Sequence, residues 1–266
     1  MKVAIAQINS SHTVAENLTK VQDYARRSAE SGADVVVFPE ATMTAFGSDL
    51  AAAAQEHGEH WKTELQWLAA ETEITVIVGE FAPAEDGKVR NILAVYTPSG
   101  ERLDYAKMHL YDAFGFTESE TVSAGQDVVV VNIAGVNVGL SLCYDIRFPK
   151  LYAELSRQGA DVCVVSASWA GGEGKVEQWE TLARARALDS NTLVVAVDQA
   201  DPAASGISVT PGAPTGVGHS LVSDPFGHVL HSFGEDEQLR VIELDLDVVR
   251  RAEKSIPVLE NAKLGY

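Results

Sequence analysis

Apolar residues follow two different spacings near the start of the chain, and each spacing predicts a different element. Val3–Ile8 is a short apolar run that favours a strand. Apolar residues then recur at steps of three and four, which predicts a helix that Gly32 ends; they are Leu18, Val21, Tyr24, Ala25 and Ala29. In Asp34–Phe38, β-branched residues follow one another without alternation, as in a strand buried on both faces. The chain therefore opens with a βαβ unit.

The same two patterns continue to the carboxyl end. Further helices are expected over 51–72, 148–157, 176–190 and 248–254, and further strands over 73–80, 92–96, 128–131, 136–142, 161–166, 192–198, 220–223, 228–232 and 239–244. Asp86-Gly87 and Ala134-Gly135 join neighbouring strands as hairpins, so the sheets should be mixed rather than parallel throughout. Ala200–Gly218 has the Gly, Pro, Ser and Thr content of a long loop, a kind of segment that is often functional. No composition break marks a linker, and we expect one domain over residues 1–266.

Composition narrows the range of partners and compartments. Lys and Arg number 20 against 38 Asp and Glu, a net charge of −18 that repels nucleic acid and anionic membranes. The sequence shows neither a signal-peptide pattern nor an apolar run of about 18 residues that could span a bilayer. With Cys143 and Cys163 as its two cysteines, a disulfide framework is not expected. We therefore expect a cytoplasmic protein that binds neither nucleic acid nor membranes.

The two cysteines stand in different contexts. Cys143 follows the apolar strand that ends at Leu142, and a helix is expected to begin near Pro149. A thiol at such a strand-to-helix turn lies near backbone N–H groups that can stabilise an oxyanion. Cys163 lies inside the apolar run Val162–Val165, which is typical of an inert packing residue. Position alone makes Cys143 the better candidate nucleophile, although most isolated cysteines serve only packing.

A cysteine nucleophile needs a base, because a free thiol with a pKa of about 8.5 is mostly neutral at pH 7. None of the histidines has a papain-like or caspase-like context. Glu40 follows Phe38-Pro39 at the end of a buried strand, where desolvation would raise its pKa towards that of a useful base. Lys107 lies among apolar and aromatic neighbours and could place a fixed positive charge beside an anionic intermediate. Each signal is weak when taken separately.

Taken together, Phe38-Pro39-Glu40, the segment Lys107–Leu110 and the motif Cys143–Pro149 resemble the nitrilase superfamily of carbon–nitrogen hydrolases. Their order and spacing are similar to those of its Glu-Lys-Cys triad, and the resemblance extends from the first strand to the tail Pro257–Tyr266. It implies an α/β fold, a four-layer α-β-β-α sandwich with two mixed sheets. It also implies pairing by two-fold symmetry into a homodimer or a higher homo-oligomer.

The resemblance also implies roles for single residues. Cys143 would be the nucleophile and Glu40 the general base. Lys107 and the backbone N–H of Tyr144 would hold the oxyanion, and Glu118 would position the lysine and the base. The reaction would need no metal and no organic cofactor, because side chains and backbone supply the nucleophile, the base and the electrostatic clamp.

Other positions are expected to shape the pocket or brace the scaffold. Phe46, Phe114 and Trp169 are candidate substrate-binding residues, but the segments around Phe46 and Trp169 depart from the family's commonest pattern, so its substrates do not transfer. Asp145 and Arg147 are expected to lock the turn that carries the nucleophile. A further internal ion-pair network is expected among Glu180, Arg184 and Arg186.

The sequence therefore predicts an amidase that releases ammonia and a carboxylic acid from a small linear amide through a thioester. An N-carbamoyl-amine hydrolase or a nitrilase on the same triad is the nearest alternative; the former needs a carboxylate-binding cation that the sequence does not locate. A metal-dependent hydrolase is a more distant alternative, because His57 and His60 are three residues apart but lack an evident third ligand. The last alternative is an inactive binding module on the same scaffold.

Overall fold

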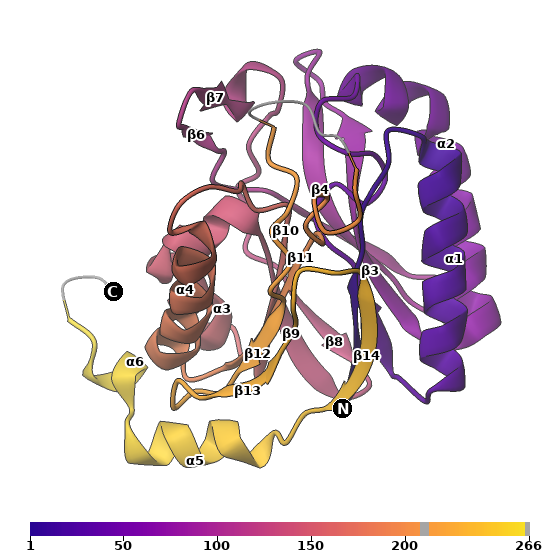
Figure 1. Cartoon of the computed structure of the whole chain (residues 1–266). Helices are drawn as coiled ribbons and strands as arrows, with labels where there is room; N and C mark the ends of the chain where they lie inside the picture. The colour runs from indigo at the N-terminus through magenta and orange to yellow at the C-terminus, as the bar shows by residue number, and fades with distance from the viewer. Residues whose placement is uncertain (208–212, 264–266) are drawn as a thin grey trace.

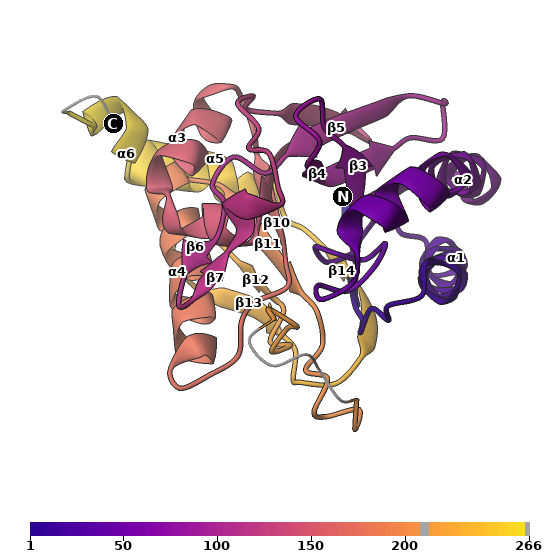
Figure 2. The same ribbon diagram turned by 90° about the horizontal axis from the view of Figure 1, so that it is seen from above.

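A computed structural model describes residues 1–207 and 213–263. Two six-stranded sheets pack face to face, and a pair of helices covers the outer face of each, which gives four layers (Figures 1 and 2). The first helical layer and sheet come from the amino-terminal half: β1 (Lys2–Gln7), α1 (Val14–Glu30), β2 (Val35–Val37), α2 (Leu50–Thr72), β3 (Thr75–Pro83), β4 (Val89–Tyr96) and β5 (Arg102–Ala106).

The second sheet and helical layer follow in the chain. They comprise β8 (Val130–Ile133), β9 (Val136–Leu142), α3 (Pro149–Arg157), β10 (Val162–Ala167), α4 (Lys175–Ser190), β11 (Leu193–Asp198), β12 (Leu221–Ser223) and β13 (Val229–Ser232). The chain then returns to the first sheet as β14 (Gln238–Glu243), which pairs with β1, and ends in α5 (Asp247–Ser255) and α6 (Val258–Asn261). A small hairpin of β6 (Asp112–Ala113) and β7 (Phe116–Thr117) lies between the two halves of the chain.

The two sheets share one pattern of strand directions. The first has the order β14-β1-β2-β3-β4-β5, and the second has the order β13-β12-β11-β10-β9-β8. In each, three neighbouring strands are parallel, namely β1, β2 and β3 or β9, β10 and β11. Antiparallel strands complete both sheets at their edges. The predicted α/β sandwich with two mixed sheets is therefore confirmed.

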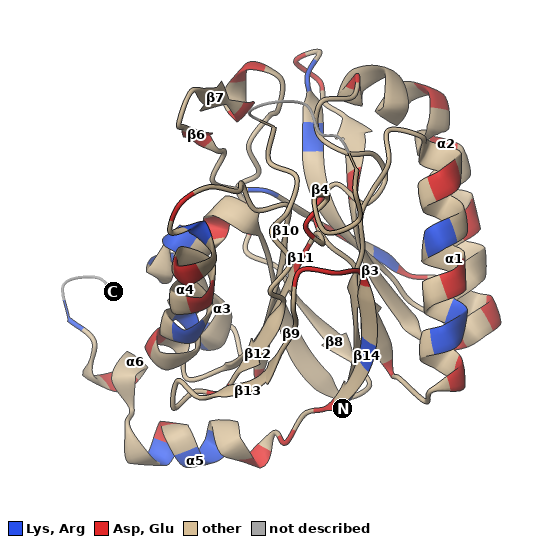
Figure 3. Ribbon diagram, viewed as in Figure 1, with Lys and Arg blue, Asp and Glu red and all other residues tan. Residues whose placement is uncertain are grey.

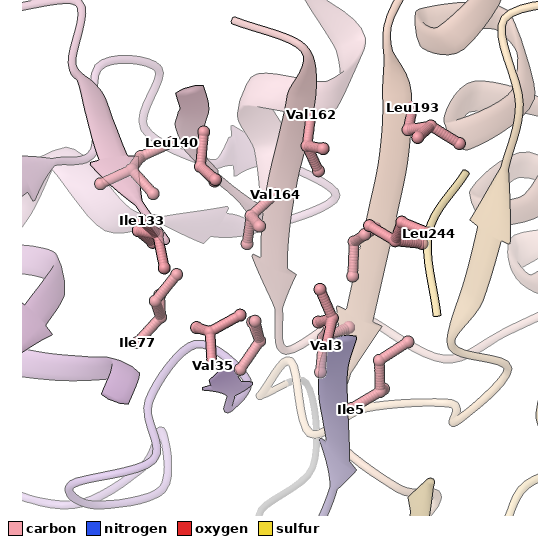
Figure 4. Close-up of a cluster of buried hydrophobic side chains, with 14 of the residues drawn as sticks. Val3, Ile5, Val35, Ile77, Ile133, Leu140, Val162, Val164, Leu193 and Leu244 are labelled. Carbon is pink, nitrogen blue, oxygen red and sulfur yellow. The ribbon is translucent and has the colours of Figure 1, made fainter. Parts of the chain in front are cut away.

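Strand alternation explains why each sheet is buried on both faces. Val3 and Ile5 of β1 join the core between the sheets, in one cluster with Val164 and Leu244 (Figure 4). Their neighbours Ala4 and Ala6 point the other way and pack against the layer of α1 and α2. Successive side chains of a strand point to opposite faces, so an unbroken apolar run is what a sheet between two layers requires.

The structure adds elements that the apolar pattern did not predict. β5 has the mostly polar sequence Arg102–Ala106 because it is an edge strand with an exposed side. The hairpin β6–β7 is too short to show a period. Of the predicted loop Ala200–Gly218, residues 208–212 lie outside the described residues, as do 264–266 of the expected tail. Within the described ranges, no helix is both long and apolar enough to cross a bilayer.

Candidate active site

Segments at the ends of strands from both sheets meet at one cavity. Glu40 lies three residues beyond β2, and Lys107 directly follows β5 of the same sheet. Cys143 directly follows β9 of the other sheet, and Ser168 directly follows β10. All four line a cavity of about 360 Å³. The carboxyl ends of parallel strands are where α/β folds collect ligand-facing groups, so the topology itself assembles this site.

The backbone at Cys143 is held in an unusual conformation. Its φ angle is 44°, in the left-handed region that non-glycine residues rarely adopt. The residue opens a short 3₁₀ turn, Cys143–Arg147, between β9 and α3. Asp145 stabilises this turn because its carboxylate accepts hydrogen bonds from the backbone N–H of Leu142 (2.9 Å) and the hydroxyl of Tyr105 (2.6 Å). A sharp turn after a strand presents the side chain to a cavity, as nucleophile turns do in other hydrolases.

Glu40, Lys107 and Glu118 form a buried ionic cluster beside Cys143. Their side chains are 0%, 2% and 2% exposed. The ammonium Nζ of Lys107 donates to Glu40 Oε1 at 2.8 Å and to Glu118 Oε2 at 2.9 Å. The other oxygen of Glu40 accepts from the backbone N–H of Ser168 at 2.9 Å. The predicted catalytic residues are thus brought together, and their charges are paired as buried charges must be.

Burial and charge shift the proton affinities of this cluster in a consistent way. Burial raises the pKa of Glu40, although the ammonium of Lys107 opposes the shift. Burial and the carboxylate of Glu40 raise the pKa of Cys143 well above its ordinary value. The carboxylates of Glu118 and Glu40 outweigh burial and raise the pKa of Lys107. Lys107 therefore stays charged, while the Cys143 thiol keeps its proton until a base removes it.

Asn91 belongs to the same cluster and was not predicted from the sequence. Its amide nitrogen donates to Glu40 Oε1 at 2.8 Å and to Glu118 Oε1 at 3.0 Å. The residue is fully buried in the middle of β4. Asn91 directly precedes the apolar run Ile92–Tyr96, and an amide at the start of such a run would have been the available signal, because buried amides are normally held by polar partners.

The predicted pocket residues divide into two groups. Phe46 and Trp169 are buried and line the cavity together with Tyr144. Phe114 is 80% exposed and does not line it. It lies at the tip of the β6–β7 hairpin, where its φ of 54° turns the chain. Further residues that line the cavity are Tyr111, Phe116, Arg147, Ser168, Ala170, Lys175 and Pro214.

Two other expectations end differently. Glu180, Arg184 and Arg186 do not form one network, because each has its own partner. Arg186 donates to the carbonyl oxygen of Ile146 at 3.0 Å, so it braces the turn that carries the nucleophile. His57 and His60 are exposed on α2, and no group of three potential metal ligands was found in residues 1–207 and 213–263.

Comparison with known proteins shows the family to which this chain belongs. The family description "Carbon-nitrogen hydrolase" matches residues 2–254. The chain belongs to the carbon–nitrogen hydrolase family. A Mycobacterium tuberculosis protein named only as a hydrolase is 50% identical over 266 residues, covering 98% of this chain and 95% of that protein. The deaminated glutathione amidase of Synechocystis is 32% identical, covering 97% and 96%.

A solved structure supports the fold of this carbon–nitrogen hydrolase. Nit3 of Saccharomyces cerevisiae, a member of branch 10 of the nitrilase superfamily, superposes with a TM-score of 0.82. The match has 24% sequence identity and covers 97% of this chain and 94% of Nit3. The family match confirms the predicted resemblance to the carbon–nitrogen hydrolases, and this structure confirms the predicted four-layer fold.

Proposed function

We propose that this carbon–nitrogen hydrolase is an amidase that converts a small linear amide into ammonia and a carboxylic acid. The observation that carries the proposal is the buried Glu40–Lys107–Glu118 cluster against Cys143 at the end of one small cavity. The cavity that these groups line is small, which suits a small molecule. The Synechocystis relative, an amidase, supports an amide over a nitrile.

The first half of the reaction forms a thioester. Cys143 Sγ attacks the carbonyl carbon of the amide, and its proton passes to Glu40. Lys107 Nζ and the backbone N–H of Tyr144 stabilise the negative oxygen, since Tyr144 is the residue that follows the nucleophile. The carbon–nitrogen bond breaks as Glu40 returns the proton to nitrogen, and ammonia leaves. Two carboxylates and one ammonium already leave the cluster negative, so a resting thiolate would add a further uncompensated charge.

The second half regenerates the enzyme. Glu40, again ionised, takes a proton from a water molecule that attacks the thioester carbon. The carbon–sulfur bond then breaks, the sulfur recovers its proton, and the carboxylic acid is released. Asn91 and Glu118 hold the carboxylate of Glu40 and the ammonium of Lys107 in place through both steps. One amide and one water thus give one ammonia and one acid.

The alternative reactions on the same triad differ in the group whose carbon the Cys143 thiol attacks. An N-carbamoyl-amine hydrolase would release carbon dioxide in addition to ammonia and an amine, and a nitrilase would consume a nitrile.

The homodimer and the cytoplasmic location predicted above are part of the proposal. The family resemblance implies that the helix after the Cys motif and the helix around Trp179–Arg186, here α3 and α4, supply the dimer contact. Leu188 on α4 is 42% exposed, and its substitution by Glu should produce a monomer by analytical ultracentrifugation.

The test is a matched panel of primary amides, N-carbamoyl amines and nitriles. Ammonia release would be measured for each, and the protein would be quenched in acid during turnover for peptide mass analysis. We expect amides to be preferred and the Cys143 peptide to carry the acyl group. Nitrile turnover above amide turnover, or acyl transfer without modification of Cys143, would overturn the proposal.

A further inference from the structure

One buried carboxylate near the cavity has no part in the reaction proposed above. Acidic residues are spread over the helical layers (Figure 3), whereas Asp198, the last residue of β11, is fully buried. It pairs in register with Ala167, the last residue of the parallel strand β10. Ser168 and Trp169 follow β10 and line the cavity. Because a buried carboxylate is costly unless donors hold it, the partners of Asp198 indicate its role.

Both oxygens of Asp198 accept hydrogen bonds from backbone N–H groups. Oδ1 accepts from Trp169 at 2.8 Å and Oδ2 accepts from Val217 at 2.9 Å. Trp169 and Val217 pack in the same apolar cluster as Cys143. Burial raises the pKa of Asp198, and the N–H groups of Val217 and Trp169 oppose the shift. Since both partners are donors, these hydrogen bonds favour the ionised side chain and make it an anchor for the backbone.

The N–H group of Trp169 belongs to the same planar peptide group as the carbonyl of Ser168. That carbonyl oxygen accepts a hydrogen bond from Cys143 Sγ at 3.8 Å. A planar peptide group rotates as a unit, so a carboxylate that fixes its N–H also fixes its oxygen. The negative charge of Asp198 polarises the same group and strengthens the carbonyl as an acceptor. Asp198 and the nucleophile therefore hold the two ends of one peptide group.

Ser168 is fixed at two further points. Its backbone N–H donates to Glu40 Oε2 at 2.9 Å, and its hydroxyl donates to the carbonyl oxygen of Pro214 at 2.8 Å. The base thus contacts the N–H of Ser168, while the nucleophile contacts the carbonyl of the same residue. The position of the thiol relative to the base consequently depends on how Ser168 is oriented.

The second oxygen of Asp198 ties another part of the cavity wall to the same place. Val217 follows Gly216, whose N–H donates to the carbonyl oxygen of Trp169 at 3.0 Å. Pro214, two residues before Gly216, lines the cavity. One carboxylate therefore joins this wall to the peptide group that contacts the nucleophile.

We infer that Asp198 is a positioning residue for the nucleophile: it orients the Ser168–Trp169 peptide group, and this group places the thiol of Cys143. Asp198 does not line the cavity, so it acts through the peptide group and not on the substrate. Its effect on turnover rests on the proposed function, whereas the hydrogen bond of the resting thiol does not. The role predicts a loss in kcat that exceeds any change in KM.

Infrared spectroscopy of the S–H stretch reads the thiol directly. Cys143→Ala identifies the band of Cys143, and the band of Cys163 is an internal reference. Asp198→Ala should move the Cys143 band to higher frequency, because the hydrogen bond to Ser168 weakens, and should leave the Cys163 band in place. Asp198→Asn should move it less in the same direction, since a neutral amide oxygen polarises the peptide group less than a carboxylate does.

The matched control is Asp224→Asn. Asp224 is also buried, and it accepts from the backbone N–H groups of Phe226 at 3.0 Å and His228 at 2.9 Å. These residues form the turn between β12 and β13, outside the cavity lining. The control should leave the Cys143 band and kcat unchanged, and thermal unfolding would show that each variant is folded.

Turnover of the best amide supplies the second readout. Asp198→Ala should lower kcat by about 100-fold and Asp198→Asn by about 10-fold, with KM changed by less than about threefold. If Asp198→Ala does not fold, the Asn variant decides. An unmoved Cys143 band in the folded variants, or a rise in KM as large as the fall in kcat, would overturn the positioning role. A shifted band in a protein whose wild type hydrolyses no amide would support that role and overturn the amidase.

Discussion

The two cysteines of this chain are both buried, but they have different surroundings. Cys143 is 7% exposed and Cys163 is fully buried, and they lie on or next to neighbouring strands of the second sheet. Cys163 lies within β10, where its sulfur accepts a hydrogen bond from the hydroxyl of Thr192 at 3.4 Å. Cys143 follows the end of β9, at a backbone φ of 44° and beside a carboxylate.

This difference teaches that burial does not decide the role of a thiol. Burial raises the pKa of both sulfurs, and it raises that of Cys163 to about 12. What separates them is access to a base and to a cavity, because Cys143 lines the active-site cavity together with Glu40 and Cys163 does not line it. Inside a strand, both faces of the backbone are occupied by neighbours, so reactive groups concentrate where strands end. The comparison leads to four predictions.

The largest effect should come from removing the thiols one at a time. Cys143→Ala should lower kcat/KM by about 10⁴-fold or more, because the covalent step is lost. The matched variant Cys163→Ala should keep kcat and KM within about threefold, since its side chain faces the layer of α3 and α4. Ammonia release on the best amide measures both.

Circular dichroism and thermal unfolding would confirm that both variants are folded. If Cys163→Ala lost as much activity as Cys143→Ala while remaining folded, the distinction between the two thiols would be wrong.

The next effect tests the base that distinguishes Cys143. Glu40→Gln keeps the shape of the side chain but cannot accept the thiol proton, so kcat should fall by about 10²- to 10⁴-fold. Because burial raises the pKa of Glu40 above the ordinary 4.5, kcat/KM of the wild type should decline with acid at a pH above 4.5. The variant should lose that acid limb, and its residual rate should rise with pH as the thiol ionises.

The rate of Cys143 alkylation by iodoacetamide gives the control, read by peptide mass analysis. It should fall in Glu40→Gln, while Cys163 stays unmodified in both proteins. An unchanged acid limb in the variant would show that another group is the base.

The sequence predicted the fold better than it predicted the pocket. The physical reason is that the fold shows in local sequence patterns, whereas the pocket depends on residues that are distant in sequence. A strand that is buried on both faces has an unbroken run of apolar residues, such as Val35–Val37. Strands of the central layers can therefore be recognised from the local sequence. β5 was missed because an edge strand has polar residues on its exposed side. Asn91 was missed because its partners, Glu40 and Glu118, are distant in sequence and meet it only after folding.

The pocket depends on longer-range geometry. Lys175 and Phe114 come from different elements, yet the ammonium of Lys175 lies 3.7 Å from the ring centroid of Phe114. No local sequence pattern encodes this contact. Phe114 was expected in the cavity wall on the resemblance alone, and the structure places it on the outside of that wall. Residue type and order were therefore enough to propose the catalytic cluster, while the direction of each pocket side chain required the structure.

A smaller effect should follow from loosening the cluster around the base. Asn91→Leu removes the two amide hydrogen bonds to Glu40 and Glu118 but leaves Lys107 in place. Hydrogen bonds to charged groups contribute about 1.5–3 kcal/mol, so we expect kcat to fall by about 10- to 100-fold with little change in KM.

The control is Asn132→Leu, an exposed asparagine on β8, which should leave kcat unchanged. A change in KM as large as that in kcat would show that Asn91 contacts the substrate instead of positioning the base.

The smallest effect concerns the inert thiol. Its folded-state pKa of about 12 exceeds the ordinary value of 9.0, so the folded protein keeps this proton at pH values where the unfolded chain releases it. The stability that Cys163 contributes is therefore complete below pH 9 and decreases as the pH rises towards 12. Between pH 8 and pH 10.5 the loss from this group should be about 2 kcal/mol.

Cys163→Val, a change of similar volume, should cost less than about 1.5 kcal/mol at pH 8 and should remove that alkaline loss. Urea unfolding of both proteins at the two pH values measures it, because both proteins contain the same buried tyrosines. Parallel loss of stability in the variant and the wild type would show that Cys163 does not titrate as a buried thiol.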